Sequence, residues 1–295
     1  MQRLRLLFLA ILAVLIALPA QGQLVVSLTI KRRTYVRYEP IVATVNITNL
    51  SGRDIMLQDA GQPWFGFDVT GVDTETLVPP TDPNYTLEPL EIKLGETVKR
   101  SVNLTKLYGI GEYGIHRVKA TVFAKEFDKM FTSQPSIVEI TEGTTLWSQK
   151  VGVPETLANA GRTHKVSVLS HDSDKHYLYV RVEDEEQGHV FCTHRIGHVI
   201  DGVPPQMQLD TTNNLYVLQL VGPKLYTLTT IGVNGEFYGQ TTYDAPKSQP
   251  YMRRLADGTV QLVGGKKQVT TATAANGKAI PLPKISDRPV GLPTD

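Results

Sequence analysis

The sequence of this 295-residue chain predicts an all-β protein behind a short N-terminal leader. Past the leader, no stretch of about 12 residues has apolar residues at the i, i+3, i+4 and i+7 spacing of an amphipathic helix. Short runs rich in Val, Ile, Thr and Tyr alternate instead with Gly, Pro, Asn and Asp, which is typical of strands and turns. The one helical candidate is Glu155 to Ala160.

The leader has the features of a secretory signal peptide. A positive start is followed by the apolar run Leu6 to Leu18 and by small residues at Ala20 and Gly22. We expect residues 1–22 to be removed, with cleavage before Gln23. The run is shorter than the ~20 residues that span a bilayer, and no second such run follows. The expected protein is secreted or periplasmic and has no membrane span once the signal is removed.

The charge and cysteine content exclude several classes. Without Arg3 and Arg5, 28 of the 30 Lys and Arg residues remain against 29 Asp and Glu. Such a balance gives no electrostatic reason to expect nucleic acid or an anionic membrane as partner. Cys192 is the only cysteine, so an internal disulfide is impossible. This favours a bacterial envelope or secreted protein that is stabilised by its apolar core.

Residues 23–142 are predicted to form a first β domain. The segment Ile41 to Leu50 places Ile41, Ala43, Val45 and Ile47 on one face and polar residues on the other, as a half-buried strand requires. Seven to eight short strands in about 120 residues are typical of a two-sheet sandwich. The other expected strands are Leu24–Ile30, Asp54–Gln58, Phe65–Val69, Val98–Leu104, Gly114–Phe123 and Ile137–Ile140.

Two short motifs in this domain resemble elements of known sandwiches. Gly95-Glu96-Thr97 is a turn before one strand, and Gly111-Glu112-Tyr113 precedes the long strand near the end of the domain. In these elements the domain resembles immunoglobulin-like domains of bacterial exported proteins, including macroglobulin-type and fibronectin-type sandwiches. The resemblance implies an immunoglobulin-like fold but no activity.

Residues 143–265 are predicted to form a second antiparallel domain of repeated hairpins. Tyr177 to Ile196 and Leu215 to Ile231 each contain two strands around a short turn, and they are followed by Asp201-Gly202 and Asn234-Gly235. We expect type I′ turns at these dipeptides, with positive φ at both positions. The spacing resembles that of β-propeller blades, but about 120 residues supply at most three blades, and a closed ring needs at least four. An open stack of blades or a second sandwich is therefore expected.

The tail, residues 266–295, is poor in large apolar residues and is expected to be disordered.

A histidine and cysteine cluster is the one chemical anomaly. His189, Cys192 and His194 lie close together on one predicted strand. Alternation places Cys192 and His194 on one face, about 7 Å apart along the strand, which is within reach of one transition metal. The same alternation places His189 on the other face. These residues are a candidate metal site, whereas a structural role for the imidazoles and a core role for the thiol are the alternative.

A second candidate is aromatic. Trp64 and Phe65 could form a platform for a sugar or a peptide, or else be part of the sandwich core. The acidic run Glu183 to Glu186 lacks the ligand spacing of a calcium loop. No sequence motif of a hydrolase, metalloprotease or nucleotide-binding enzyme is present.

The expected function is therefore that of an exported, non-enzymatic binding or structural module of the bacterial envelope. It would have no cofactor and an unknown protein or polysaccharide as partner. The alternative is a metal-binding protein or an enzyme that uses His189, Cys192 and His194. A third hypothesis is a protease inhibitor that presents the proline-rich loop Pro79 to Pro89, because this loop is long for a hairpin connection.

Overall fold

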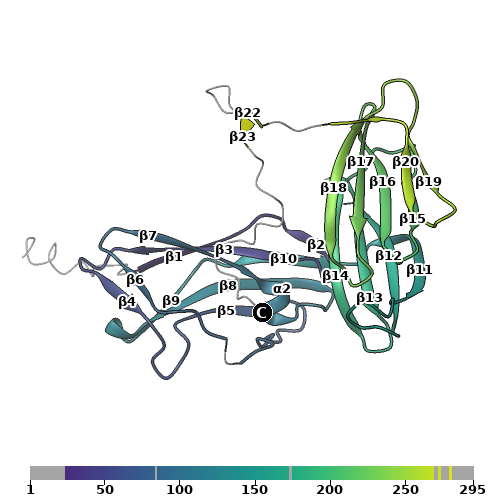
Figure 1. Cartoon of the computed structure of the whole chain (residues 1–295). Helices are drawn as coiled ribbons and strands as arrows, with labels where there is room; N and C mark the ends of the chain where they lie inside the picture. The colour runs from purple at the N-terminus through teal and green to yellow at the C-terminus, as the bar shows by residue number, and fades with distance from the viewer. Residues whose placement is uncertain (1–23, 84, 173–174, 269–271, 274–278, 281–295) are drawn as a thin grey trace, which may run out of the picture. The chain divides into compact units, whose positions relative to one another are not determined.

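The computed structural model describes residues 24–83, 85–172, 175–268, 272–273 and 279–280. Over these residues the chain is nearly all β and is built mainly of antiparallel sheets, which confirms the all-β prediction (Figure 1). None of the helices described is long and apolar enough to cross a membrane. The predicted signal peptide, residues 1–22, and most of the predicted tail, residues 266–295, lie outside the described residues.

The described residues of the first half form ten strands, a short α-helix and a 3₁₀ turn. Several strands coincide with the predicted ones to within two residues. The elements are β1 (Leu24–Ile30), β2 (Thr34–Val36), β3 (Val42–Asn49), β4 (Ile55–Leu57), β5 (Phe65–Gly71), β6 (Leu90–Ile92), β7 (Thr97–Asn103), α2 (Leu104–Tyr108), β8 (Gly114–Ala124), η1 (Lys125–Phe127), β9 (Lys129–Thr132) and β10 (Ser136–Thr141).

In the second half, the elements formed by the described residues are all strands. The elements are β11 (Thr144–Gly152), β12 (Thr163–Asp172), β13 (His176–Asp184), β14 (His189–His198), β15 (Gln206–Leu209), β16 (Leu215–Gly222), β17 (Leu225–Ile231), β18 (Phe237–Asp244), β19 (Tyr251–Arg254), β20 (Val260–Val263), β21 (Lys266–Lys267), β22 (Ala272–Thr273) and β23 (Ala279–Ile280).

The chain divides into two compact units that interleave in sequence. The first comprises Met1–Lys31, Val42–Val102 and Arg117–Ile137, and the second comprises Arg32–Ile41, Asn103–His116 and Val138–Asp295. The second unit therefore joins the predicted hairpin domain with two segments from the stretch predicted as the first domain.

The first unit is organised around β3. Its strand order is β1-β3-β7 in one sheet, and the unit also holds β5, β9 and most of β8, where β8 pairs with both β5 and β9. Ala43, Val45 and Ile47 are fully buried, as their alternation predicts. At the end of β3 the buried Asn49 side chain donates hydrogen bonds to the carbonyls of Arg53 and Ile92, so the turn after β3 is fixed to β6.

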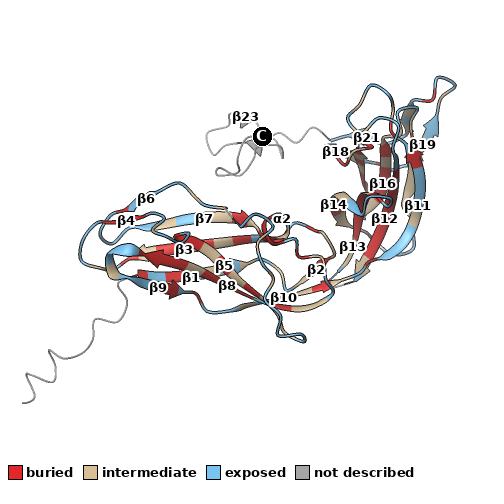
Figure 2. Ribbon diagram, turned by 90° about the horizontal axis from the view of Figure 1, so that it is seen from below, coloured by how far each residue is buried: buried red, intermediate tan, exposed pale blue. Residues whose placement is uncertain are grey.

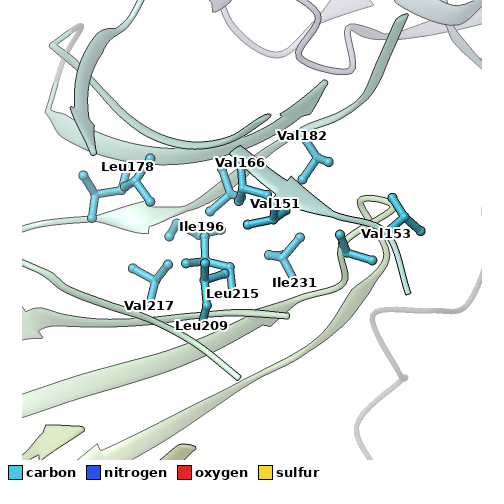
Figure 3. Close-up of a cluster of buried hydrophobic side chains, with 13 residues drawn as sticks. Val151, Val153, Val166, Leu178, Val182, Ile196, Leu209, Leu215, Val217 and Ile231 are labelled. Atoms are coloured by element: carbon cyan, nitrogen blue, oxygen red, sulfur yellow. The ribbon is translucent and has the colours of Figure 1, made fainter. Parts of the chain in front are cut away.

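The second unit contains two large antiparallel sheets. Sheet I has the order β11-β12-β13-β14, and sheet II has the order β15-β16-β17-β18-β21. Thirteen buried side chains from the two sheets form one apolar core, which is shown in Figure 3. The hairpin β19–β20 packs against sheet II through Met252 and Leu262, which contact a second cluster around Leu218 and Tyr226. The three layers account for the repeated hairpins of the sequence.

Two local predictions are wrong. Glu155 to Ala160 forms turns and no helix, whereas the five-residue α2 begins at Leu104 and is capped by Asn103, whose side chain accepts a hydrogen bond from the Thr105 amide. Neither Asp201-Gly202 nor Asn234-Gly235 forms a type I′ turn, because in each pair only the glycine has positive φ. The second turn instead spans Gly232 to Gly235 and is closed by the Gly235 amide on the Gly232 carbonyl. Here the glycine follows the two central residues of the turn.

We expect Leu178→Ala to lower the free energy of unfolding by about 2–5 kcal/mol, because the side chain is fully buried between sheets I and II and its loss leaves a cavity. The measurement is chemical denaturation followed by circular dichroism. Leu146→Ala is the matched control. This leucine is 45% exposed on β11, and its truncation should change the stability by less than about 0.5 kcal/mol. Equal effects of the two variants would contradict the assignment of this core.

Candidate functional site

The predicted histidine and cysteine cluster lies on β14, at the contact between sheets I and II. Cys192 is opposite Val182 and His194 is opposite Val180, so both share the face that looks toward sheet II. The register shifts at Phe191, where a bulge places His189 opposite Asp184. His189 therefore occupies a position on this same face, and not on the other face that simple alternation predicts.

Two histidines of sheet I hold the Gly232–Gly235 turn of sheet II. The His164 Nδ1 donates to the Val233 carbonyl at 2.8 Å, and the His194 Nε2 donates to the Gly235 carbonyl at 3.0 Å. Gly235 approaches β14 so closely that a Cβ atom would lie 3.0 Å from the Cys192 Sγ. A glycine is therefore required here both by its positive φ and by the space available.

The thiol of Cys192 is held in its neutral form. Burial raises its pKa to about 12, and the Sγ lies 4.0 Å from the Val180 carbonyl. A thiolate is the form that attacks substrates and binds metals, so this environment disfavours both uses. Among the described residues, no three His, Cys, Asp or Glu side chains come together in a way that could hold a metal ion. The structure thus places His189, Cys192 and His194 on one strand but engages them in packing and backbone contacts.

The aromatic pair lies in the interior of the first unit. Trp64 is 0% exposed and Phe65 is 2% exposed, with ring centroids 5.5 Å apart. The Trp64 Nε1 donates to the Leu87 carbonyl at 3.0 Å. Both rings therefore belong to the core and do not form a surface platform. The same hydrogen bond ties the largely exposed Pro79–Pro89 loop, in which residue 84 is outside the described residues, to this core.

A polar cluster on the other face of sheet I was not predicted. Arg181 of β13 is 7% exposed, and its guanidinium donates to Glu142 at 2.9 Å and to the Arg37 carbonyl at 2.8 Å. Its Nε also donates to Thr193 at 3.3 Å on the neighbouring strand. The only signal in the sequence is an arginine among the apolar residues of the segment Tyr177 to Val182.

The Gly111-Glu112-Tyr113 motif completes this cluster. The Tyr113 hydroxyl donates to Glu142, and this hydrogen bond is the main cause of a raised Tyr113 pKa. The Arg37 guanidinium lies between the rings of Tyr38 and Tyr113, 4.7 Å and 4.8 Å from their centroids. A Cβ atom at Gly111 would lie 2.8 Å from the Tyr38 ring. The motif therefore serves to fix the segments Arg32–Ile41 and Asn103–His116 on sheet I.

The edges of sheets I and II differ in how they are covered. On β14, the carbonyl of Ile196 accepts from the side chains of Gln219 and Gln240. The four-residue β15 is joined to the start of β19 through the Gln206 side chain, which accepts from the Met252 amide. The last two residues of β18, Tyr243 and Asp244, are paired with β21. Each of these three edges is thus short or partly capped, which limits pairing with other extended chains.

The edge of β11 is the exception. Seven of its nine residues are exposed, and no described segment pairs with its outer side (Figure 2). A bulge at Leu146 breaks the register with β12, so the regular part begins at Trp147. The Gly152 carbonyl is already bound by the Asn213 side chain at 2.8 Å. We call the segment Trp147–Val151 the β11 edge. Its outward amides and carbonyls can bind an extended chain.

Lys150 gives the β11 edge a positive charge. It lies directly opposite Lys165 of β12, and both ammonium groups contact Glu185, at 2.7 Å and 2.8 Å. Hydrogen bonds from Lys150 first, and then from Lys165, lower the pKa of Glu185 to about 2. Lys165 also contacts Glu183 at 3.4 Å, so it has two carboxylate partners, whereas the ion pair of Lys150 is with Glu185.

We expect Arg181→Met to lower the free energy of unfolding by about 1–3 kcal/mol, because it removes charged hydrogen bonds from a buried position. In a double-mutant cycle with Glu142→Gln, the coupling should be near 1 kcal/mol, since Glu142 is partly exposed to water. Arg162→Met is the control, because this exposed arginine lies 3.6 Å from Asp184 and should contribute little. A coupling of zero would show that the contact between Arg181 and Glu142 does not stabilise the fold, which would contradict the role given to this cluster.

We expect the Cys192 thiol to react with iodoacetamide at pH 8 about 10³-fold more slowly in the folded than in the unfolded protein, because its pKa is about 12 instead of 9.0. A Cys192→Ser protein carrying Ser148→Cys on the exposed β11 is the control and should react rapidly. Since the folded state favours the neutral thiol, its contribution to stability is present below about pH 9 and is lost as the pH rises toward 12. Fast alkylation of the native protein would contradict this environment.

Comparison of the chain with protein-family models, with curated proteins and with solved structures found no match. We therefore infer its function from its own residues.

Proposed function

We propose that this chain is exported through its N-terminal signal and acts as a non-enzymatic binding or structural module of the bacterial envelope. Its partner would be a protein or a polysaccharide. The module would consist of an immunoglobulin-like sandwich and an open, propeller-like stack of sheets.

The proposal is supported mainly by the environment of the cysteine and histidine side chains, which are engaged in packing and in hydrogen bonds to the backbone. The one thiol is buried with a pKa of about 12, and His164 and His194 donate to carbonyls of the Gly232–Gly235 turn. Each of these rings donates through one nitrogen and keeps a lone pair only on the other, so each histidine has at most one nitrogen left for a metal or a proton. The cluster with the strongest chemical signal in the sequence thus supports the contact between two sheets.

The arrangement of the sheets supports both the sandwich and the propeller-like stack of this proposal. Sheets β1-β3-β7 and β2-β10-β8-β5 suit a sandwich, and the Gly111-Glu112-Tyr113 motif directly precedes β8. Sheets I and II each begin with four consecutive antiparallel strands and stack face to face, as neighbouring propeller blades do. The β19–β20 hairpin lies on the other side of sheet II as a third, two-stranded layer.

We expect the full-length chain, made in a Gram-negative host, to be found in the periplasm or the medium with Gln23 as its first residue, because residues 1–22 have the composition of a cleavable signal. The measurements are cell fractionation and N-terminal mass spectrometry. Leu12→Arg, which interrupts the apolar run, should leave the uncleaved protein in the cytoplasm. A cytoplasmic, uncleaved wild-type chain would overturn the export part of the proposal.

Elemental analysis of the mature protein tests the non-enzymatic part against the metal hypothesis. Metal below one tenth of an equivalent, unchanged in a His194→Ala/Cys192→Ser variant, agrees with the proposal. Stoichiometric zinc or copper that is lost in this variant would overturn it and assign the cluster a catalytic or metal-binding role.

A further inference from the structure

We propose that the β11 edge binds an extended peptide segment containing an acidic residue, which adds to sheet I as a fifth strand. This inference rests on the proposed function, since it names the partner class of the binding module. It follows from the contrast among the sheet edges, from the two faces of the edge and from its charge.

The contrast among edges comes first. An uncapped strand edge is a hazard, because any other extended chain can pair with it. Within sheets I and II, the β14 edge is capped by glutamine side chains, β15 is four residues long, and the last two residues of β18 are paired with β21. Compared with these three strands β11 is the most exposed, since seven of its nine residues are exposed. An edge left open beside three edges that are short or partly covered is one that a partner can occupy.

The two faces of the edge favour an extended chain of alternating character. Trp147 is half-buried against the shared core of sheets I and II, and Val151 on the same face is buried in it. Ser148 and Lys150 lie on the opposite face and are exposed. An added strand with apolar residues on the first face would cover the remaining surface of Trp147, and polar residues on the second would stay in water.

The charge of the edge selects an acidic residue. Lys150, Lys165 and Glu183 lie in one row across three strands, and both lysines share Glu185. Like charges directly opposite each other destabilise a sheet. A carboxylate on the added strand beside Lys150 would give this lysine a cross-strand partner, as Glu183 already is for Lys165. A basic residue at that place would extend the row to three cations.

The test uses three synthetic peptides with the mature protein, and fluorescence polarisation as the readout. Peptide E is acetyl-TVTVEVTV-amide, peptide K replaces its glutamate by lysine, and the third is peptide E with N-methyl groups on alternate amides. We expect peptide E to bind about fivefold more tightly than peptide K, as cross-strand charge pairs allow. The N-methylated peptide should not bind, since it cannot donate hydrogen bonds to the edge.

Charge reversal provides the sharper comparison. Lys150→Glu should invert the preference, so that peptide K binds more tightly than peptide E. Lys247→Glu, which makes the same change at an exposed lysine of the same unit, should leave the preference unchanged. Equal binding of peptides E and K, binding of the N-methylated peptide, or no binding of peptide E would overturn the inference.

A second copy of the chain is the competing occupant. A dimer in analytical ultracentrifugation that Lys150→Glu dissociates, with no binding of peptide E, would assign the edge to self-association and overturn the peptide proposal. Export and metal content are independent of these measurements. An exported, metal-free protein that binds no peptide therefore loses this inference and keeps the proposed function.

Discussion

The apolar contact between sheets I and II is the interaction on which the second unit depends. With one cysteine no disulfide can join two parts of the chain, so burial must offset the loss of conformational entropy. Eight of the thirteen core side chains are valine, whose branched shape packs well on a pleated sheet. Apolar contact has little directionality, however. The sliding of one sheet over the other is opposed by directional bonds at the rim, from Gln219 to β14 and from His164 and His194 to the Gly232–Gly235 turn.

The position of β13 imposes a second constraint. One of its faces contributes Leu178, Val180 and Val182 to the shared core, and the other is covered by the segment around Val36. A strand buried on both faces is expected to be apolar throughout. Arg181 is tolerated because Glu142, Thr193 and the Arg37 carbonyl satisfy its donors. This arginine therefore ties together segments that are far apart in the sequence, and its burial depends on all of them being in place.

Much of the fold could be predicted because local patterns determine it. The alternation in Ile41 to Leu50 gave β3 and its buried face, since one side of that strand meets the core. The use of Trp64 and Phe65 could not be predicted, because an aromatic run looks the same in a core and on a surface. The face of His189 depended on a one-residue bulge at Phe191, which leaves no trace in the composition of the strand. The Arg181 cluster joins residues up to 144 positions apart, beyond any local pattern.

The way in which the edges of sheets I and II are covered affects both the stability of the second unit and its proposed function. Glutamine is an effective cap for β14 because one side-chain amide can donate to two carbonyls, as Gln219 does with Ile196 and His198. Such capping needs a second sheet alongside, and sheet II supplies it to β14. β11 lies at the opposite end of sheet I, three strands away, and out of reach of those side chains. Its protection consists of the bulge at Leu146, the Asn213 side chain on the Gly152 carbonyl and Lys150, which forms an ion pair with Glu185. A lysine repels basic chains but attracts acidic ones, so what is left at this edge selects among partners and does not exclude them all.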